Sequence, residues 1–328
     1  MKVIHLVHWK KSGIYVAVNN LKKEGSLHGD AHDIITLRQN HNTLDLFKSI
    51  FILGHFLLKC YTGKYDSINL HSFLPHIINL FLINKKSFLF FHSNYPFLSG
   101  TSTKEKLKKF FTKKSIKSAS HPICVSKVVK QSVDAALDVD STIVYNLIDS
   151  PNTYVTCPTK INSFGSIGRF DTEKRFLELI QKFIESNTGS SLHFAGDGAL
   201  LPEANTIIAK HQKNNVLFHG RQESLSPFFK AIDAYICCSK YEGFGLAIAE
   251  AMLAGKIIIS THVGILKENL DFDFIKIEDD LSNLKVCIHL AEQLDEHSIA
   301  KIVENNRNII VKTFKNNSIY SAYIDALK

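Results

Sequence analysis

One segment, Ala234–Lys256, limits most strongly what this chain can fold into. Its apolar run Ala234–Cys238 predicts a buried strand, and a glycine loop and an apolar helix follow, which is the order found in parallel α/β units. The helix carries a single carboxylate, Glu250, among aliphatic side chains. Burying that carboxylate costs several kcal/mol unless protein donors or a ligand hydroxyl bind it. The segment therefore predicts a strand, a loop and a helix around a polar pocket.

The loop of this segment has the features of a ligand site. Gly243 and Gly245 let backbone N–H groups approach a ligand closely, and the helix start that follows favours negative or hydroxyl-rich groups. Glu242 on the loop and Glu250 on the helix would then flank one pocket at the carboxyl end of a parallel strand, where open α/β sheets bind ligands. The alternative is an ordinary strand-loop-helix unit in which a neighbouring Lys or Arg satisfies Glu250.

The segment resembles the paired-glutamate signature of retaining nucleotide-sugar glycosyltransferases with the GT-B fold, most closely glycosyltransferase family 4. The resemblance implies that Glu250 holds the ribose hydroxyls of the nucleotide. It implies a catalytic role for Glu242, which with the backbone of Phe244 and Gly245 would face the donor sugar and its departing phosphate. The donor-binding residues expected in this segment are Gly243, Phe244, Gly245, Leu246 and Glu250.

A second segment is predicted to bind the diphosphate of the donor. A short strand ends at Gly168, Arg169 follows at the turn, and we expect Lys174 in the first turn of a helix. An Arg and a Lys together neutralise the charge of a leaving diphosphate without proton transfer. The segment resembles the family's Gly-Arg and Lys arrangement, which implies donor binding by Gly168 and catalytic roles for Arg169 and Lys174. The alternative is a solvated helix start, which we expect for Glu173 and Arg175.

Three more turns complete the predicted donor site. Gly196 opens a Gly-Asp-Gly turn that the family often has beneath the nucleotide, although such a turn is also common between helices and strands. The resemblance places the backbone around His219 near the base. It places Gly13 near the donor phosphate and the acceptor, although the family has two glycines where this chain has Ser12 and Gly13. We expect no catalytic role for the last loop, around Gly264.

Histidines end two predicted strands of the first half. His92 follows the apolar strand at 87–91, and the resemblance implies that it is a catalytic residue that contacts the transferred sugar. The alternative is a hydrogen-bonded histidine of the core. His71 ends the preceding strand in the same way, and we expect it to be structural or to line the acceptor site.

The expected fold class is α/β, with the GT-B architecture of two Rossmann-like doubly wound domains that face each other across a cleft. Short apolar strands alternate with helical patterns in both halves of the 328 residues, and 45% of the residues are hydrophobic. We expect an N-terminal acceptor-binding domain at 1–155 and a C-terminal nucleotide-sugar domain at 156–312. The turn at 146–149 ends the first domain, and the linker is 150–162. A final helix at 313–328 is expected to cross back to the first domain.

Neither a metal nor another cofactor is expected. The sequence has no His-Glu-x-x-His motif, and its two Asp-x-Asp motifs do not follow a strand in a glycine-rich pocket. Arg169 and Lys174 would replace a divalent cation electrostatically. The six cysteines form no Cys-x-x-Cys pair, which favours a reducing compartment. Because we find no signal peptide and no long apolar run, we expect a cytoplasmic protein.

The net charge of +8 is unevenly distributed. The stretch Lys104–Lys117 has seven lysines around Leu107, Phe110, Phe111 and Ile116. Such a basic amphipathic helix could lie on an anionic membrane surface at the inner face of the plasma membrane, with about 1 kcal/mol from each lysine near the surface. The alternative is a solvated face of the enzyme. No nucleic-acid partner is expected, because no recognition motif accompanies the lysines.

The predicted function is retaining transfer of a hexose-type sugar from a nucleoside-diphosphate sugar to an acceptor hydroxyl. By analogy, the acceptor is a lipid-linked saccharide in the assembly of bacterial surface polysaccharide, such as O-antigen, capsule or lipopolysaccharide. Two alternatives stay open: a non-catalytic, nucleotide-binding partner subunit of a glycosyltransferase complex, and a GT-B nucleotide-sugar epimerase. The sequence does not define the base, the sugar, the linkage or the oligomeric state.

Overall fold

The computed structural model describes residues 1–10, 12–38, 43–83, 85–93, 95, 98, 100–118, 121–148, 157–212 and 215–328. The chain forms two compact units. Unit 1 consists of Met1–Ile148 with Phe314–Lys328, and unit 2 is Asp149–Thr313. From the sequence, these divisions were expected at 155/156 and 312/313. Most of the predicted linker, and Asp149 of the turn before it, lie outside the described residues.

Unit 1 is built on a six-stranded parallel sheet with the strand order β2-β1-β3-β4-β5-β6. The two central strands β3 and β4 are buried along their whole length, as expected for strands covered on both faces. The strands are β1 (Lys2–Trp9), β2 (Ala31–Arg38), β3 (Ser67–His71), β4 (Ser87–Phe91), β5 (His121–Cys124) and β6 (Thr142–Ile143). The helices are α1 (Gly13–Leu27), α2 (Thr43–Thr62), α3 (Phe73–Ile78), η1 (Asn79–Phe81), α5 (Thr103–Ser118), α6 (Lys127–Leu137) and α13 (Asn316–Ala326).

Unit 2 has a second six-stranded parallel sheet, with the order β12-β11-β10-β7-β8-β9. The order reverses between β7 and β10, so these neighbouring strands send their helices to opposite sides of the sheet and leave a crevice at their carboxyl ends. The strands are β7 (Ser163–Ile167), β8 (Ser191–Ala195), β9 (Val216–Phe218), β10 (Ala234–Cys237), β11 (Ile257–Thr261) and β12 (Ile275–Ile277). The helices are α7 (Phe176–Ser186), α8 (Leu201–His211), α9 (Ser226–Lys230), α10 (Leu246–Leu253), η2 (Gly264–Lys267), α11 (Leu284–Glu292) and α12 (Glu296–Thr313).

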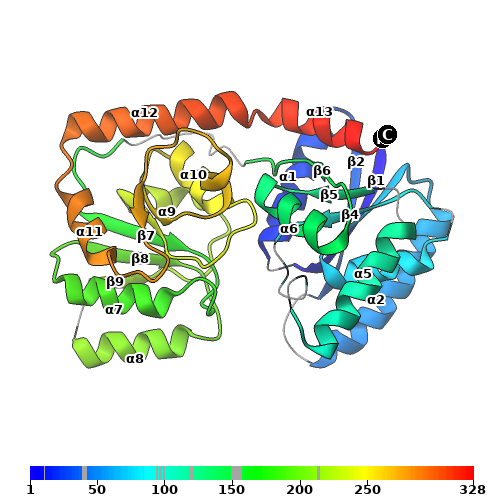
Figure 1. Ribbon diagram of the computed structural model, residues 1–328, viewed down its shortest axis with the longest axis horizontal. Coiled ribbons are helices and arrows are strands. Elements are labelled where there is room, and N and C mark those ends of the chain that lie inside the picture. The colour runs from blue at the N-terminus through cyan, green and yellow to red at the C-terminus, as the bar shows by residue number, and fades with distance from the viewer. Residues whose placement is uncertain are drawn as a thin grey trace. The chain divides into compact units, whose positions relative to one another are not determined.

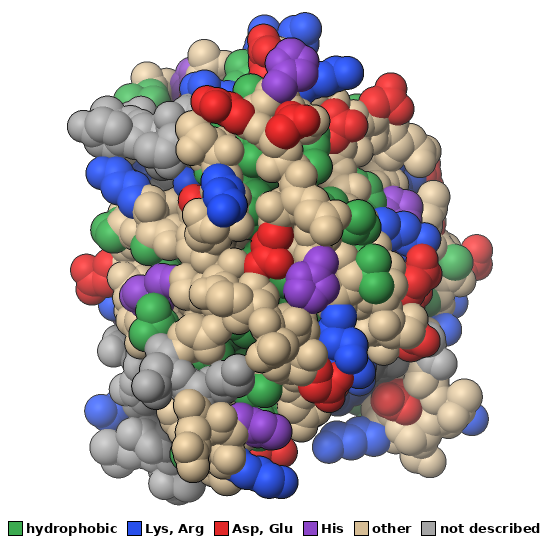
Figure 2. Space-filling model, turned by 90° about the vertical axis from the view of Figure 1, so that its left-hand side faces the viewer, with side chains coloured by type: hydrophobic (Ala, Val, Ile, Leu, Met, Phe, Trp, Pro, Cys, Tyr) green, Lys and Arg blue, Asp and Glu red, His purple; other side chains and the backbone are tan. Residues whose placement is uncertain are grey.

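Helices cover both faces of the sheet of unit 2. Helix α7 packs against α8 and α11, and α10 packs against α12, with the strands between α7 and α12 in Figure 1. The core between these layers is aliphatic and aromatic, with Phe164, Phe183 and Phe194 fully buried. The face shown in Figure 2 carries acidic and basic side chains side by side, and its hydrophobic side chains form only small groups. The side chains of the described residues therefore form no large apolar patch on this face.

The final helix α13 belongs to unit 1. It packs against α1, and the Asn316 side chain forms two hydrogen bonds with the backbone of Ile148, at 3.2 and 3.1 Å. Tyr320 and Tyr323 of this helix are buried. The last residues of the chain thus complete the core of a unit whose other residues all precede position 149.

The described part of the chain contains no helix with the length and hydropathy of a bilayer span. Within the same residues, no group of three His, Cys, Asp or Glu side chains is arranged to hold a metal ion.

Candidate functional site

The strand-order reversal of unit 2 brings the two predicted catalytic segments together. The loop after β7 and the loop after β10 are joined by a hydrogen bond of 2.9 Å from the backbone N–H of Lys240 to the carbonyl of Glu173. Beside it, the Lys174 ammonium forms an ion pair with a carboxylate oxygen of Glu242. Both residues were predicted as catalytic, and the structure makes them direct partners at the crevice.

Glu242 and Lys174 are partly shielded from water, with side chains 17% and 22% exposed. The Ser239 hydroxyl also donates to Glu242, at 2.7 Å. Burial alone would lower the pKa of Lys174, but the negative charge of Glu242 outweighs it and raises the pKa above its ordinary value. The ammonium therefore stays charged at neutral pH. It can neutralise a second anion, such as a phosphate, that enters the crevice.

The structure corrects two expectations for the segment around Lys174. Helix α7 begins at Phe176, so Lys174 lies in the turn before the helix and not in its first turn. The Asp171 carboxylate accepts a hydrogen bond from the backbone N–H of Lys174 at 3.1 Å, and Arg175 has a left-handed backbone with φ 56°, so the turn stays distinct from the helix. Arg175 is buried and donates to the carbonyl of Asp279 at 2.5 Å, whereas a solvated side chain was expected. Glu173 is exposed, as expected.

Arg169 lies at the carboxyl end of β7 but does not join the Lys174–Glu242 pair. Its guanidinium is 3.1 Å from a carboxylate oxygen of Asp171, and its side chain is 63% exposed. The guanidinium is therefore an exposed positive charge two residues beyond the carboxyl end of β7.

The other predicted donor-binding turns lie on consecutive loops after β7, β8 and β9. The backbone N–H of Gly168 donates to Ala195, and that of Gly196 donates to Gly220, at 3.0 and 2.8 Å. A Cβ at Gly196 would lie 1.7 Å from the carbonyl oxygen of Gly168, so only glycine permits this approach. His219 forms a hydrogen bond of 2.9 Å with the ring of His193, and the two rings are stacked. Backbone hydrogen bonds thus join the loops that carry Gly168, Gly196 and Gly220 into one continuous edge beside the crevice.

The helix after the second loop, α10, begins without a side-chain cap. Its N-cap is Gly245, with φ 83°, and Leu246 is the first helical residue. An uncapped helix start leaves backbone N–H groups for an anion. Glu250 is 7% exposed in the middle of this helix, as its apolar neighbours predicted. The Phe244 side chain is buried, and its carbonyl accepts from Ile265 at 2.6 Å, which ties the loop to η2.

Two predicted site residues, Gly13 and His92, belong to unit 1. Gly13 is the first residue of α1, and Ser12 caps that helix by accepting from the backbone N–H of Tyr15 at 3.1 Å. A Cβ at Gly13 would meet no described atom within 4 Å, so internal packing does not require glycine there. His92 follows β4, and its Nε2 lies 2.8 Å from Nδ1 of His71, which is fully buried.

Ser72, which follows the carboxyl end of β3, was not among the predicted site residues. The strand order of unit 1 reverses between β1 and β3, which is the position where such sheets bind ligands. Ser72 has φ 77°, and its hydroxyl is buried without a hydrogen-bond partner among the described residues. No sequence signal distinguishes it, because a serine before a helix reads as an ordinary cap.

The chain is similar to known glycosyltransferases in sequence. Residues 156–271 match the family described as "Glycosyl transferases group 1". A Klebsiella pneumoniae protein named "Uncharacterized 41.2 kDa protein in cps region" is 24% identical and is matched over 100% of this chain and 99% of its own length. The N-acetyl-alpha-D-glucosaminyl L-malate synthase of Bacillus anthracis is 28% identical over 56% of this chain and 52% of its own.

Solved structures extend the likeness to the whole fold. Sucrose-phosphate synthase from Thermosynechococcus elongatus has a TM-score of 0.83 at 17% identity, covering 99% of this chain and 98% of its own. Anabaena HepE in complex with UDP and glucose has a TM-score of 0.77 at 18% identity, covering 100% and 99%. These likenesses confirm the predicted fold class, the two-domain Rossmann-like architecture of GT-B proteins. With the family match, they support a GT-B glycosyltransferase.

Proposed function

We propose that this protein is a retaining glycosyltransferase that moves a hexose-type sugar from a nucleoside-diphosphate sugar to an acceptor hydroxyl. The observation that carries the proposal is the Lys174–Glu242 ion pair at the reversal point of the unit 2 sheet. The pair lies on the same loop system as the uncapped start of α10 and the buried Glu250. A cation, the N–H groups of a helix start without a side-chain cap, and a carboxylate are the groups that a diphosphate and a ribose need.

In the proposed reaction, the bond between the anomeric carbon and the diphosphate oxygen breaks, and a bond from that carbon to the acceptor oxygen forms on the same face. The acceptor proton passes to the leaving phosphate. Lys174 and Arg169 stabilise the charge that develops on the diphosphate. Glu250 holds the ribose, while Glu242 and His92 orient the sugar. We propose that no metal ion or other cofactor takes part, because the two cations supply the charge that a divalent ion would otherwise provide.

The first test is thermal stabilisation of the purified protein by nucleoside diphosphates and nucleotide sugars. The series starts with UDP, which the Anabaena neighbour binds. Selective binding to the folded state raises the melting temperature. We expect a shift for one nucleotide, a reduced shift in Glu250→Ala, and an unchanged shift in Glu203→Ala, which removes an exposed carboxylate of α8. No shift with any nucleotide at millimolar concentration would contradict the proposal.

The second test concerns the chemistry. Incubation of the stabilising donor with a panel of saccharide acceptors should give a product whose new linkage has the anomeric configuration of the donor, measured by NMR coupling constants. Inversion of the configuration would contradict retention. Consumption of the donor without acceptor, with formation of an epimeric sugar, would instead support an epimerase.

We propose that the acceptor is a lipid-linked saccharide of surface-polysaccharide assembly and that α5 lies on the membrane that carries it. The Klebsiella pneumoniae relative, which is matched over 99% of its length and is named for a cps region, supports a role in surface-polysaccharide assembly. The helix carries seven lysines, and its Leu107 and Phe110 side chains are 55% and 59% exposed. The adjoining η1 adds the exposed side chain of Phe81, and the turn after it adds that of Ile83. Exposed apolar side chains among lysines are the combination that binds anionic bilayers.

Co-sedimentation with vesicles tests the membrane proposal. We expect binding to phosphatidylcholine vesicles that contain phosphatidylglycerol, and weaker binding to phosphatidylcholine alone. Lys106→Glu with Lys114→Glu should weaken the binding, while Lys210→Glu on α8 should not, because all three lysines are exposed but only the first two lie on α5. Equal loss in the double variant and in Lys210→Glu would point to the net charge of the protein and not to α5.

A further inference from the structure

Four histidines form a diagonal row across the sheet of unit 1. His32 of β2 is in register with Val3 of β1, and His5 lies two residues further along β1. Val7, two residues beyond His5, is in register with His71 of β3. Alternate residues of a strand share a face and in-register residues of parallel strands point the same way, so these side chains lie on one face of the sheet.

The row continues to the predicted sugar-binding histidine. His71 is in register with Phe90 of β4, and His92 lies two residues further on. The row therefore runs from the amino edge of the sheet at β2 to its carboxyl edge beyond β4. This edge is where parallel sheets bind ligands.

Each histidine ring is hydrogen-bonded to the next. Nε2 of His92 lies 2.8 Å from Nδ1 of His71. Nε2 of His71 lies 3.0 Å from Nδ1 of His5, and Nε2 of His5 lies 2.9 Å from Nδ1 of His32. The pattern is the same at every step: an Nε2 meets the Nδ1 of the next ring. The protonation of one ring therefore determines which nitrogen of its neighbour carries the proton.

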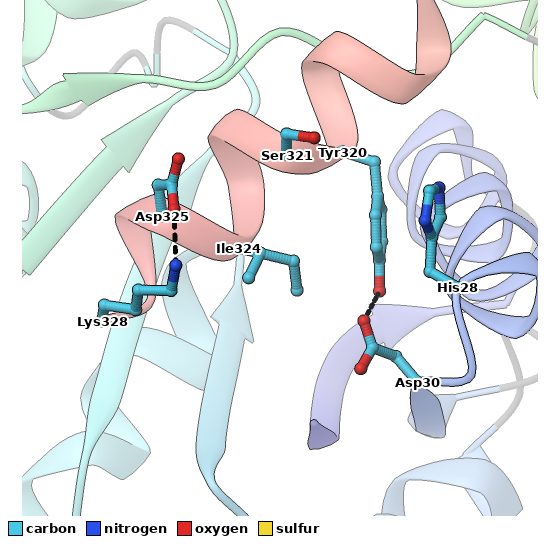
Figure 3. A pocket seen from close by; sticks show the side chains of 7 residues that line it. All are labelled: His28, Asp30, Tyr320, Ser321, Ile324, Asp325 and Lys328. Atoms are coloured by element: carbon cyan, nitrogen blue, oxygen red, sulfur yellow. Dashed lines mark hydrogen bonds and ion pairs between the residues drawn. The ribbon is translucent and has the colours of Figure 1, made fainter.

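The other end of the row is tied to the final helix. Nε2 of His32 lies 2.9 Å from the Tyr320 hydroxyl, which donates to a carboxylate oxygen of Asp30 at 2.8 Å. Figure 3 shows this tyrosine–aspartate bond at a surface hollow of about 270 Å³, with His28 beside the tyrosine ring. Burial alone would raise the pKa of Asp30, but hydrogen bonds from the Met1 amino group and from Tyr320 lower it, so Asp30 is a carboxylate at neutral pH.

Asp30 fixes the direction of every hydrogen bond in the row. A carboxylate only accepts, so Tyr320 must give it the single hydroxyl proton. The tyrosine oxygen can then only accept from His32, which must carry its proton on Nε2. A neutral imidazole has one N–H, so Nδ1 of His32 accepts from His5, and the same reasoning passes through His71 to His92.

The rings are neutral because they are buried. Burial lowers the pKa of His32 to about 4 and that of His92 to about 3, and it holds the pKa of His5 and His71 well below the ordinary value. Tyr323 packs against His32 and Phe90 from the same helix as Tyr320. Gly25 of α1 is needed beside the row, because a Cβ there would lie 2.5 Å from the His32 ring.

We propose that this row fixes the tautomer of His92: its Nε2 carries the proton and donates to His71, and its Nδ1 is held as a hydrogen-bond acceptor at the carboxyl edge of the sheet. Among the described residues, Nδ1 of His92 has no hydrogen-bond partner. If the proposed function holds, this nitrogen accepts a hydrogen bond from a hydroxyl of the bound sugar. His71, His5, His32, Tyr320 and Asp30 are then positioning residues that act through His92.

The test of the tautomer is two-bond ¹H–¹⁵N NMR of the free protein labelled at histidine. At neutral pH we expect all four rings to be neutral with the proton on Nε2. Tyr320→Phe removes the oxygen that accepts from His32, so we expect both tautomers of His92 to appear. Asp30→Asn allows Tyr320 to donate to His32, so we expect a population with the proton of each ring on Nδ1.

The matched control is Tyr323→Phe. It removes a hydroxyl from the same helix that accepts from Asn69 at 2.7 Å and, among the described residues, forms no hydrogen bond with the row. The aromatic ring that packs against His32 is kept, so the histidine signals should keep the wild-type tautomers. A wild-type His92 with its proton on Nδ1, or charged at neutral pH, would overturn the proposal. So would unchanged tautomers in both Tyr320→Phe and Asp30→Asn.

Kinetics link the tautomer to the proposed function. We expect Tyr320→Phe to lower kcat/KM for transfer by about fivefold, the effect of losing one ordered hydrogen bond, while the melting shift by the nucleoside diphosphate stays unchanged. Absence of transfer by the wild type would refute the proposed function but not the tautomer, which NMR reads independently. An unchanged kcat/KM in a variant with mixed tautomers would show that His92 does not bind the sugar through Nδ1.

Discussion

At the scale of single residues, the proposed chemistry of unit 2 depends on the Lys174–Glu242 ion pair. A half-buried ion pair is retained at a cost, because both charges lose part of their hydration. Here the ion pair keeps Lys174 charged and next to Glu242. Glu242 is the carboxylate that we propose faces the donor sugar. A ligand phosphate would share the ammonium with Glu242 and so complete its coordination.

We predict that Lys174→Met lowers kcat by roughly 10²–10³-fold, the usual effect of removing one group that stabilises transition-state charge. Methionine keeps the length of the side chain but not its charge. The control is Lys182→Met on α7, whose ammonium is 3.4 Å from Glu185 in an exposed pair and should leave kcat unchanged. Steady-state kinetics with the donor identified by thermal shift measure both. A similar loss in the two variants would contradict a specific role for Lys174.

At the scale of secondary-structure elements, the site depends on how closely the loops after β7 and β8 approach each other. Gly168 and Gly196 are in direct backbone contact, and the hydrogen bond from Gly196 to Gly220 extends the contact to the loop after β9. The contacts that join these loops are thus made by backbone atoms. The shape of the edge beside the crevice is fixed by the strands, which are held in register by their ladders.

We predict that Gly196→Ala destabilises unit 2 by more than about 2 kcal/mol and weakens nucleotide binding, because the added Cβ forces the two loops apart. The control is Gly189→Ala, at a position where a Cβ meets no described atom within 4 Å. That change should be neutral or slightly stabilising. Chemical unfolding and thermal shift with the nucleotide provide both measurements. Normal binding in a stable Gly196→Ala protein would contradict this account of the edge.

The strands of unit 1 and its helix α3 carry buried neutral histidines, and this makes the unit sensitive to acid. His32 and His76 have an ordinary pKa of 6.5 when the chain is unfolded but about 4 in the fold, because burial disfavours the charged ring. Between these pH values the unfolded state binds more protons, so stability falls as the pH falls. Above pH 6.5 both states are neutral and these rings have no effect.

We predict that the free energy of unfolding of unit 1 decreases between pH 7 and pH 5, by up to about 1.4 kcal/mol per pH unit for each such histidine. Carboxylates contribute little to a change in this range, since they titrate mainly below it. Urea unfolding followed by a probe in unit 1 at the two pH values measures the difference. Equal stability at both would show that the fold does not lower the pKa of these rings.

At the scale of the whole molecule, the chain returns to its first unit after completing the second. Helix α13 contributes Tyr320 and Tyr323 to the core beneath the unit 1 sheet, and Asn69 of β3 donates to Tyr323. The cooperative folding of unit 1 therefore needs residues from both parts of the sequence. The same helix forms the end of the histidine row, because Tyr320 is hydrogen-bonded to His32.

We predict that Tyr323→Ala destabilises unit 1 by about 3–5 kcal/mol, the range for deleting a large buried aromatic side chain, and leaves unit 2 unchanged. Ser321→Ala, on an exposed position of the same helix, should have little effect. Differential scanning calorimetry, with nucleotide added to identify the transition of unit 2, separates the two units. A loss of stability in unit 2 alone would contradict the assignment of α13 to unit 1.

The sequence by itself determined the features that depend on neighbouring residues. The apolar runs fixed the strands, the burial of Glu250 followed from its helical neighbours, and the glycine loop before Leu246 marked the start of α10. The alternation of strands and helices gave the two-domain α/β fold class. These features need only the local periodicity of the chain.

Only the tertiary structure decided which distant residues meet. Glu242 pairs with Lys174 because the strand order reverses between β10 and β7, and no spacing along the chain encodes that order. Arg175 is buried because the backbone of Asp279 passes beside it. The histidine row exists because the register of four strands brings the four rings together. In the sequence, each of these residues by itself resembles an ordinary histidine of the core. Strand order and register are set by the packing of whole sheets, which is why these contacts are absent from any local pattern.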